Sequence, residues 1–328
     1  MNDLVTVIGG SGYVGTHFCQ ILVEKKIPFE ILDLKISQRF PEKTIICDVR
    51  EIQALRASIN GKIVVNLAAI HQDNERDNSA YYQTNVLGAE NITTICSEKA
   101  VMKIIFTSSV AVYGFAPPNT DETGAIKPFN EYGITKFAAE EKFRKWQKET
   151  GRSLTIIRPT VIFGPGNRGN VYNLFKQIAS DRFLMVGRGE NYKSMAYVAN
   201  VGHFLEACRE EKTHYSLYNY VDEPNFTMNI LVSKVREQMN KGSGTGFRVP
   251  YLFGLLMGYT ADIVSLISGR NLPVSSIRVK KFCSSSSFRM TKKPSGFKPQ
   301  FSLYDAIFHT LNEEFYKQES VNEIFFSE

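Results

Sequence analysis

Short apolar runs alternate with longer segments of helical period through the first half of the chain. The helical period is clear between residues 13 and 25, where Val14, Phe18 and Ile21 recur on one face. Strands that alternate with helices predict a parallel, doubly wound sheet, in which ligands bind at the C-terminal ends of the strands. The runs predicted as strands are residues 4–8, 29–33, 44–49, 63–69, 104–109 and 154–159.

One segment of the second half is apolar on all sides rather than along one stripe. Residues 251–267 are interrupted by Asp262, two glycines and Ser265, which argues against a membrane span. Composition favours a buried helix over the alternative, a peripheral contact with an anionic bilayer. The basic residues that follow this segment are Arg270, Arg278, Lys280 and Lys281.

Composition narrows the class of protein. The chain has 328 residues, and its five cysteines are scattered without a CxxC pair, so neither a zinc site nor a disulfide framework is suggested. Residues 1–8 are predicted to enter a strand directly, so no secretory signal is expected. The net charge is +6, but the basic residues do not form the long block, interleaved with aromatic residues, that is typical of a nucleic-acid surface. The charge suits anionic small substrates or an anionic membrane surface better.

A glycine-rich loop directly follows the first strand. Gly9, Gly12 and Gly15 let the backbone turn sharply and approach a pyrophosphate, and Tyr13 and Val14 open the helix that follows. The N-terminus of that helix supplies N–H groups and positive dipole for the phosphates. In this strand–loop–helix context, the loop favours a dinucleotide site over an ordinary turn.

Two acidic residues follow the next strands. Asp33 ends the second strand, 18 residues past Gly15, where a carboxylate can accept both hydroxyls of a ribose. A carboxylate there would repel a 2′-phosphate, which favours NAD over NADP, although Arg39 nearby leaves NADP open. Asp48 ends the third strand and could meet the adenine amino group, or could instead be the N-cap of the next helix.

A tyrosine and a lysine form the candidate catalytic pair. Tyr132 begins a helix and Lys136 follows four residues later, so both side chains share one face. A neighbouring ammonium and a nicotinamide cation would lower the phenol pKa from its usual value of about 10, which would make Tyr132 a usable general base. Ser109, at the end of the fifth strand, can hydrogen-bond a reacting hydroxyl, and Ser108 is the competing choice.

Taken together, these motifs resemble the extended short-chain dehydrogenases/reductases of the NAD-dependent epimerase/dehydratase family. The resemblance implies a Rossmann-type doubly wound sheet at 1–167, to which part of 190–222 returns, and a smaller, interleaved substrate-binding domain mainly at 168–328. It implies that NAD is the cofactor, that Tyr132 is the proton acceptor, and that Lys136 also holds the nicotinamide ribose. The other matching positions, which the resemblance places around the cofactor, are Asp48, Val49, Leu67, Ala68, Ala69, Asn85 and Pro159. Asn85 would also support the active-site helix, and a homodimer would use the helices that contain Asn85 and Tyr132.

The resemblance also bears on the reaction. Dehydratases of this family carry an Asp-Glu pair after the active-site serine, whereas this chain has Val110 and Ala111, so oxidation followed by re-reduction of a sugar is favoured over elimination of water. Asn170 is implied to meet the substrate diphosphate. Lys193 stands where the family usually has an arginine, and a lysine can still neutralise phosphate as a point charge. His71 is expected to be a loop residue near the nicotinamide pocket.

Further runs resemble a bacterial branch of the family, the 4-epimerases that convert N-acetylglucosamine carried on diphospho-undecaprenol to N-acetylgalactosamine through a 4-keto sugar. These runs are residues 162–164, 168–174, 191–198 and 275–283. The resemblance implies a lipid-linked substrate, a role in surface polysaccharide (O-antigen) synthesis, and a peripheral position on the cytoplasmic face of the inner membrane. The alternatives are a UDP-N-acetylglucosamine 4-epimerase, with a soluble substrate, and an NAD-dependent sugar dehydrogenase.

Overall fold

A seven-stranded parallel sheet forms the larger half of the molecule in the computed structural model, which describes residues 4–70, 78–269, 275–317 and 323–326. Its strand order is β10-β6-β5-β4-β1-β2-β3. The six strands predicted from the apolar runs are all present, and the expected doubly wound α/β fold is confirmed. The strands are β1 (Val5–Ile8), β2 (Phe29–Asp33), β3 (Thr44–Ile46), β4 (Ile63–Asn66), β5 (Lys103–Thr107), β6 (Ser153–Pro159) and β10 (Tyr215–Tyr220).

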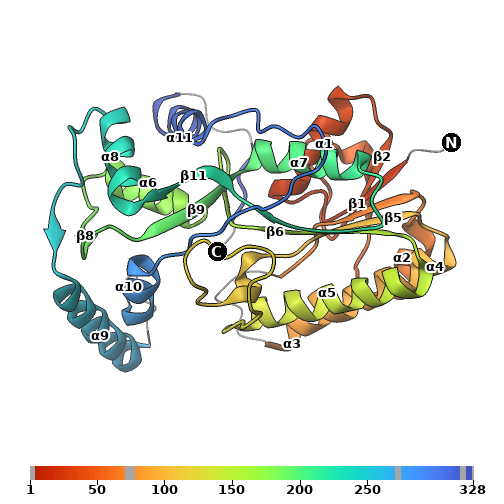
Figure 1. Cartoon of the computed structure of the whole chain (residues 1–328), viewed down its shortest axis with the longest axis horizontal. Coiled ribbons are helices and arrows are strands. Elements are labelled where there is room, and N and C mark those ends of the chain that lie inside the picture. Colours follow the sequence, from red (N-terminus) through yellow and green to blue (C-terminus); the bar gives the residue numbers. More distant parts are fainter. Residues whose placement is uncertain (1–3, 71–77, 270–274, 318–322, 327–328) are drawn as a thin grey trace.

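Helices cover both faces of this sheet (Figure 1). The helices α1 (Tyr13–Glu24) and α7 (Val198–Glu210) pack together on one face, against a core that includes Phe18, Leu22 and Phe204. The other face carries α2 (Ile52–Ser58), α4 (Gly88–Glu98) and α5 (Glu131–Thr150). Shorter helical turns are η1 (Pro41–Lys43), α3 (Asn78–Tyr81), η2 (Tyr82–Leu87) and η3 (Val110–Tyr113).

A second, smaller half is built around a three-stranded sheet of order β11-β9-β7. Its strands are β7 (Val161–Phe163), β9 (Tyr192–Tyr197) and β11 (Asp222–Thr227), and a two-stranded pair joins β8 (Met185–Val186) to β12 (Arg248–Val249). The surrounding helices are α6 (Asn170–Ala179), α8 (Met228–Gln238), α11 (Leu303–Leu311) and η4 (Asn312–Tyr316). The stretch 190–222 is shared, because β9 lies in the small sheet whereas α7 and β10 lie with the large one. The division into two domains near residue 167 stays a prediction.

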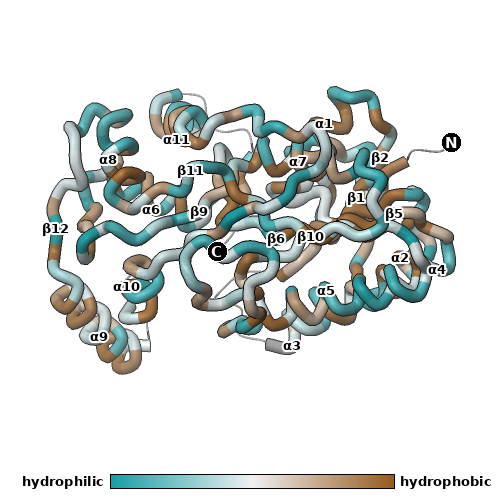
Figure 2. The backbone as a smooth tube through the Cα atoms, viewed as in Figure 1, coloured by the Kyte–Doolittle hydropathy of each residue, from teal (hydrophilic) through white to brown (hydrophobic). Residues whose placement is uncertain are grey.

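The favoured prediction of a buried helix at 251–267 was wrong. The helix α9 (Tyr251–Ser268) projects from the smaller half beside α10 (Ser276–Cys283) in Figure 1, and the tube is mostly in the hydrophobic colour there in Figure 2. Only Gly254 and Gly258 are buried, because these two glycines form the face that packs on Val186 and on the start of α10. Within the described residues, α9 is the one helix that is long and apolar enough to cross a membrane by length and composition alone.

Candidate active site

The glycine loop lies against the loop that follows β4. Gly9 has a φ of +79°, and a Cβ added there would lie 2.6 Å from the backbone nitrogen of Ala68. A Cβ on Gly15 would lie 2.5 Å from the carbonyl oxygen of Gly9. Both positions therefore require glycine. The N-cap of α1 is Gly12, so no side chain caps the N-terminal N–H groups of the helix. These N–H groups and the closely packed glycine loop suit a pyrophosphate.

The carboxylate of Asp33 lies beside this loop at the end of β2. It accepts hydrogen bonds from the backbone N–H groups of Ser11, at 3.0 Å, and Lys35, at 3.2 Å. Burial raises the Asp33 pKa, and these N–H groups oppose the rise. The carboxylate is thus held at the sheet edge where a ribose would lie, which fits NAD.

Asp48 is paired with an arginine, and its predicted contact with the adenine stays a prediction. Its carboxylate is bound by the Arg50 guanidinium, with a closest contact of 2.6 Å, and this pair lowers the Asp48 pKa. The next helix, α2, has Glu51 as its N-cap residue, so the N-cap alternative for Asp48 was wrong. Val49 is buried against Gly88, where an added Cβ would lie 2.8 Å from Val49 Cγ2.

Tyr132 and Ser109 meet at the C-terminal edge of the sheet. Tyr132 lies in the first turn of α5, whose N-cap Asn130 accepts a hydrogen bond from the Gly133 N–H at 3.0 Å. Burial raises the Tyr132 pKa to about 12, and a hydrogen bond with the Ser109 hydroxyl opposes this rise. Ser108 instead points into the interior, where its hydroxyl is buried and has no hydrogen-bond partner among the described residues. The geometry therefore favours Ser109 over Ser108.

Lys136 lies one helical turn beyond Tyr132 and is almost fully buried. Its ammonium donates to the carbonyl oxygen of Thr107 at 2.6 Å and lies 4.6 Å from the centroid of the Phe106 ring. Burial lowers the Lys136 pKa to about 7, while the Glu140 carboxylate opposes that change. This lysine can consequently change its charge near neutral pH, beside the phenol that it would activate.

Asn85 connects the active-site helix to the loop after β4. Its side-chain Nδ2 donates to Thr135 Oγ1 at 3.0 Å and to the Ile70 carbonyl at 3.1 Å, and its Oδ1 accepts from the Ile70 N–H at 2.9 Å. Leu67, Ala68 and Ala69 form the same loop, directly beyond the end of β4. His71 lies outside the described residues.

The two residues predicted to meet the substrate phosphates are not equally placed. Asn170 is exposed at the N-terminal end of α6, and Pro159 ends β6. Lys193 is turned toward α10, where its ammonium donates to the carbonyl oxygens of Lys281, at 2.9 Å, and Ser284, at 2.7 Å. A buried ammonium needs acceptors, and the C-terminal end of α10 supplies them. These contacts do not support the predicted role of Lys193 as a phosphate ligand.

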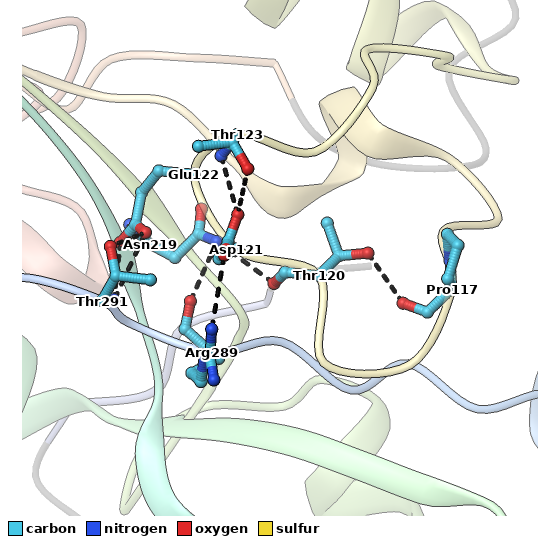
Figure 3. A network of polar contacts seen from close by, with 8 residues as sticks. All are labelled: Pro117, Thr120, Asp121, Glu122, Thr123, Asn219, Arg289 and Thr291. Atoms are coloured by element: carbon cyan, nitrogen blue, oxygen red, sulfur yellow. Dashed lines mark hydrogen bonds and ion pairs between the residues drawn. The ribbon is translucent and has the colours of Figure 1, made fainter.

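A buried polar network behind the site was not predicted. Arg158 binds Glu140 and donates to the Tyr113 hydroxyl at 2.7 Å, and this hydroxyl donates to Asn219 Oδ1 at 2.8 Å. Figure 3 shows how Asn219 continues the network to the 117–123 loop, where Glu122 accepts from the Asn219 N–H and from Thr291. Glu140 lies one turn beyond Lys136 on the same helix, and this position is the sequence signal that could have indicated the buried network.

The fold, the glycine loop and the Tyr132–Lys136 pair together define an NAD-dependent dehydrogenase-type site. The chain belongs to the NAD dependent epimerase/dehydratase family, whose model matches residues 5–219. Over 320 residues it is 47% identical to the N-acetyl-alpha-D-glucosaminyl-diphospho-ditrans,octacis-undecaprenol 4-epimerase of Escherichia coli O157:H7, with 96% of each chain covered. The predictions of the family, of an enzyme and of NAD as the cofactor are confirmed.

Solved structures show the same fold. The UDP-glucose 4-epimerase of Thermotoga maritima has a TM-score of 0.74 at 19% identity, with 94% of this chain and 97% of that chain covered. The UDP-glucose 4-epimerase of Thermus thermophilus, solved in complex with NAD, has a TM-score of 0.69 at 17% identity, with 94% and 98% covered.

Proposed function

We propose that this protein is an NAD-dependent 4-epimerase that interconverts N-acetylglucosamine and N-acetylgalactosamine on diphospho-undecaprenol, for surface polysaccharide synthesis. The 47% identity to a 4-epimerase of that substrate, over nearly the whole of both chains, carries the proposal. The Tyr132, Lys136 and Ser109 side chains, gathered at the C-terminal edge of the large sheet, support it.

The chemistry assigns a separate task to each side chain. NAD, held at the glycine loop and at Asp33, would supply the acceptor for the hydride that leaves the sugar and the donor for its return. Tyr132 removes the proton of the 4-hydroxyl and gives it back, and Ser109 orients that hydroxyl. Lys136 in its charged form favours the phenolate of Tyr132, because an ammonium on the same helical face lowers the phenol pKa.

The residues after Ser109 favour epimerisation over loss of water. Val110 and Ala111 lie in η3, directly after Ser109, and neither can donate or accept a proton. Loss of water needs a base at the carbon next to the oxidised centre and an acid at the hydroxyl that leaves. Oxidation and re-reduction need only the tyrosine, lysine and serine.

Direct assay of the purified enzyme tests the substrate. N-acetylglucosaminyl-diphospho-undecaprenol and UDP-N-acetylglucosamine are supplied separately, and the sugar of each product is released and identified. Epimer formed only from the lipid-linked sugar is the expected result. Epimer formed only from the nucleotide sugar would assign the soluble alternative, and net NADH release would assign a dehydrogenase; either result would refute the proposal. Tyr132→Phe is the control for contaminating activity.

We also propose that α9 rests on the anionic cytoplasmic surface of the bacterial inner membrane. Leu252, Leu266 and Ile267 are 77%, 85% and 81% exposed, which is unusual for side chains gathered on one apolar helix. The neighbouring α10 carries Arg278, Lys280 and Lys281, which suit acidic lipid headgroups; the predicted fourth member, Arg270, lies outside the described residues. An apolar helix beside a basic cluster matches interfacial binding.

Flotation with lipid vesicles tests the membrane proposal. Binding to vesicles that contain anionic lipid, weaker at high salt or with neutral lipid, is expected. A protein that dimerises through α9 and does not bind vesicles would contradict the membrane proposal. The homodimer expected through the helices that contain Asn85, in η2, and Tyr132, in α5, uses another surface and stays a separate prediction.

A further inference from the structure

A cavity lies between α9, α10 and the turn that joins β8 to β9. Its volume is about 410 Å³, within the roughly 300–1,000 Å³ typical of small-molecule sites. In Figure 1, β8, α9 and α10 lie at the same end of the smaller half. The lining residues that matter here are Val186, Arg188, Tyr251, Lys280, Cys283 and Ser284.

The cavity has an apolar wall and a charged rim. Val186, Tyr251 and Cys283 supply the wall, whereas Arg188 and Lys280 are exposed cations at its edge, with the Glu190 carboxylate also on the lining. Tyr251 is the first residue of α9, so the wall continues onto the exposed apolar helix. A ligand with an anionic group and an apolar chain would therefore fit, with the anionic group at the charged rim and the chain against the apolar wall.

Several polar groups on or beside the cavity lining are already paired within the protein. The Asn191 side chain donates to the carbonyl oxygens of Phe282, at 2.8 Å, and Ser284, at 3.2 Å. Lys193 also donates to Ser284, and the Cys283 thiol lies 3.5 Å from the Val186 carbonyl. Few polar groups remain to recognise a nucleoside base, which needs specific hydrogen bonds.

Contacts through α10 connect the cavity to the segment that directly precedes Tyr132. The Lys281 ammonium lies 5.5 Å from the centroid of the Phe129 ring, and Phe129 precedes Tyr132 by three residues. Phe129 in turn stacks on Phe115, with 4.5 Å between ring centroids. A substrate whose sugar reaches Tyr132 can therefore extend past Phe129 and Lys281 toward the cavity.

We infer that this cavity receives the isoprene unit next to the diphosphate of the lipid-linked substrate, while Arg188 and Lys280 meet the diphosphate. The rest of the chain then passes along α9 into the bilayer. The inference rests on the proposed function, which supplies the lipid-linked sugar. It assigns the recognition of the carrier lipid to residues separate from those that act on the sugar.

A native cysteine offers a direct test. Four of the five cysteines are buried, whereas Cys283 is partly exposed on the cavity wall. Burial raises the Cys283 pKa, so the thiol is alkylated with a bulky maleimide at a mildly alkaline pH. The Cys283→Ser enzyme, treated in the same way, controls for other sites of reaction, and the Cys283→Trp variant fills the cavity without a reagent.

Two synthetic substrates are compared: N-acetylglucosaminyl diphosphate esterified to a short isoprenoid, and the same diphosphate as its methyl ester. Filling the cavity is expected to lower kcat/KM at least tenfold for the isoprenoid ester, and less than twofold for the methyl ester. The isoprenoid ester should also slow alkylation of Cys283, which the methyl ester should not. Equal losses of kcat/KM for both substrates would overturn the inference. So would a rate of Cys283 alkylation that neither ester lowers. Failure of the proposed function is distinguishable, because the unmodified enzyme would then epimerise neither ester.

Discussion

Glu140 holds Arg158 through two hydrogen bonds, 2.8 Å from Nε and 2.5 Å from Nη2, one helical turn beyond Lys136. Both side chains are buried, and Arg144 binds the same carboxylate at 2.7 Å. The pair joins the catalytic helix α5 to β6. It also places a negative charge beneath Lys136, which opposes the effect of burial on the lysine pKa.

Glu140→Gln is therefore expected to destabilise the protein strongly. The substitution leaves the Arg158 charge buried without its carboxylate, and removing one partner of a buried ion pair costs about 3–5 kcal/mol. Urea unfolding measures the loss. Glu141→Gln is the matched control, since Glu141 is the next residue on the helix, is 56% exposed and, among the residues that the structure describes, forms its ion pair with Arg144 alone. A loss of no more than about 1 kcal/mol is expected there. Equal losses for the two variants would contradict the role of the buried pair.

Lys136 is expected to make the stability of the NAD-free enzyme depend on pH. Its pKa is lowered from 10.5 to about 7, so between these values the unfolded chain binds more protons than the folded one. Stability should therefore rise with pH across this window, by up to about 1.4 kcal/mol per unit for one group. Lys136→Met should flatten the rise between pH 7.5 and 9.5 in the unfolding free energy. Lys145→Met, at an exposed position of the same helix, should keep the full slope.

Tyr132→Phe should lower kcat by about 10²–10⁴-fold, because the substitution removes the proton-transferring hydroxyl and keeps the ring. Ser109→Ala should cost less, since Ser109 orients the hydroxyl and does not take its proton. Both variants should retain NAD after purification, which is measured by releasing the cofactor from denatured protein. A Tyr132→Phe enzyme that keeps more than a tenth of the wild-type kcat would exclude Tyr132 as the base.

Asp33→Ser should shift the cofactor preference from NAD toward NADP. The variant loses a charge-assisted interaction with the ribose hydroxyls, worth about 1.5–3 kcal/mol, and removes the charge that repels a 2′-phosphate. NAD affinity should fall roughly tenfold to a hundredfold, measured by titration of the NAD-free protein. Asp48→Asn serves as the comparison, because Arg50 already occupies that carboxylate, and an equal shift there would assign the ribose to Asp48 instead.

The large sheet followed from the sequence because its central strands are buried on both faces and are continuously apolar, as in β4 and β5. The strand β10 was not predicted, because its sequence contains Tyr and Asn residues and is not continuously apolar. It pairs with β6, which lies far from β10 in the chain. The exposure of α9 was also missed, because a helix that is apolar all round is normally buried. The contacts of Lys193 depend on α10, which lies 88 residues further along the chain, and no local pattern could supply that pairing.

Paired substitutions on the outer end of α9 should separate membrane binding from catalysis. Leu266→Glu with Ile267→Glu places two charges at positions that are 85% and 81% exposed, so the fold should tolerate them. These charges should abolish flotation with anionic vesicles, because they remove the apolar contact and repel acidic headgroups. Met102→Glu, at a 58% exposed position on the larger half, should leave flotation unchanged. If the double variant binds vesicles as the wild type does, α9 is not the membrane contact. If it loses epimerase activity on a water-soluble isoprenoid ester as well, the helix contributes to the site itself.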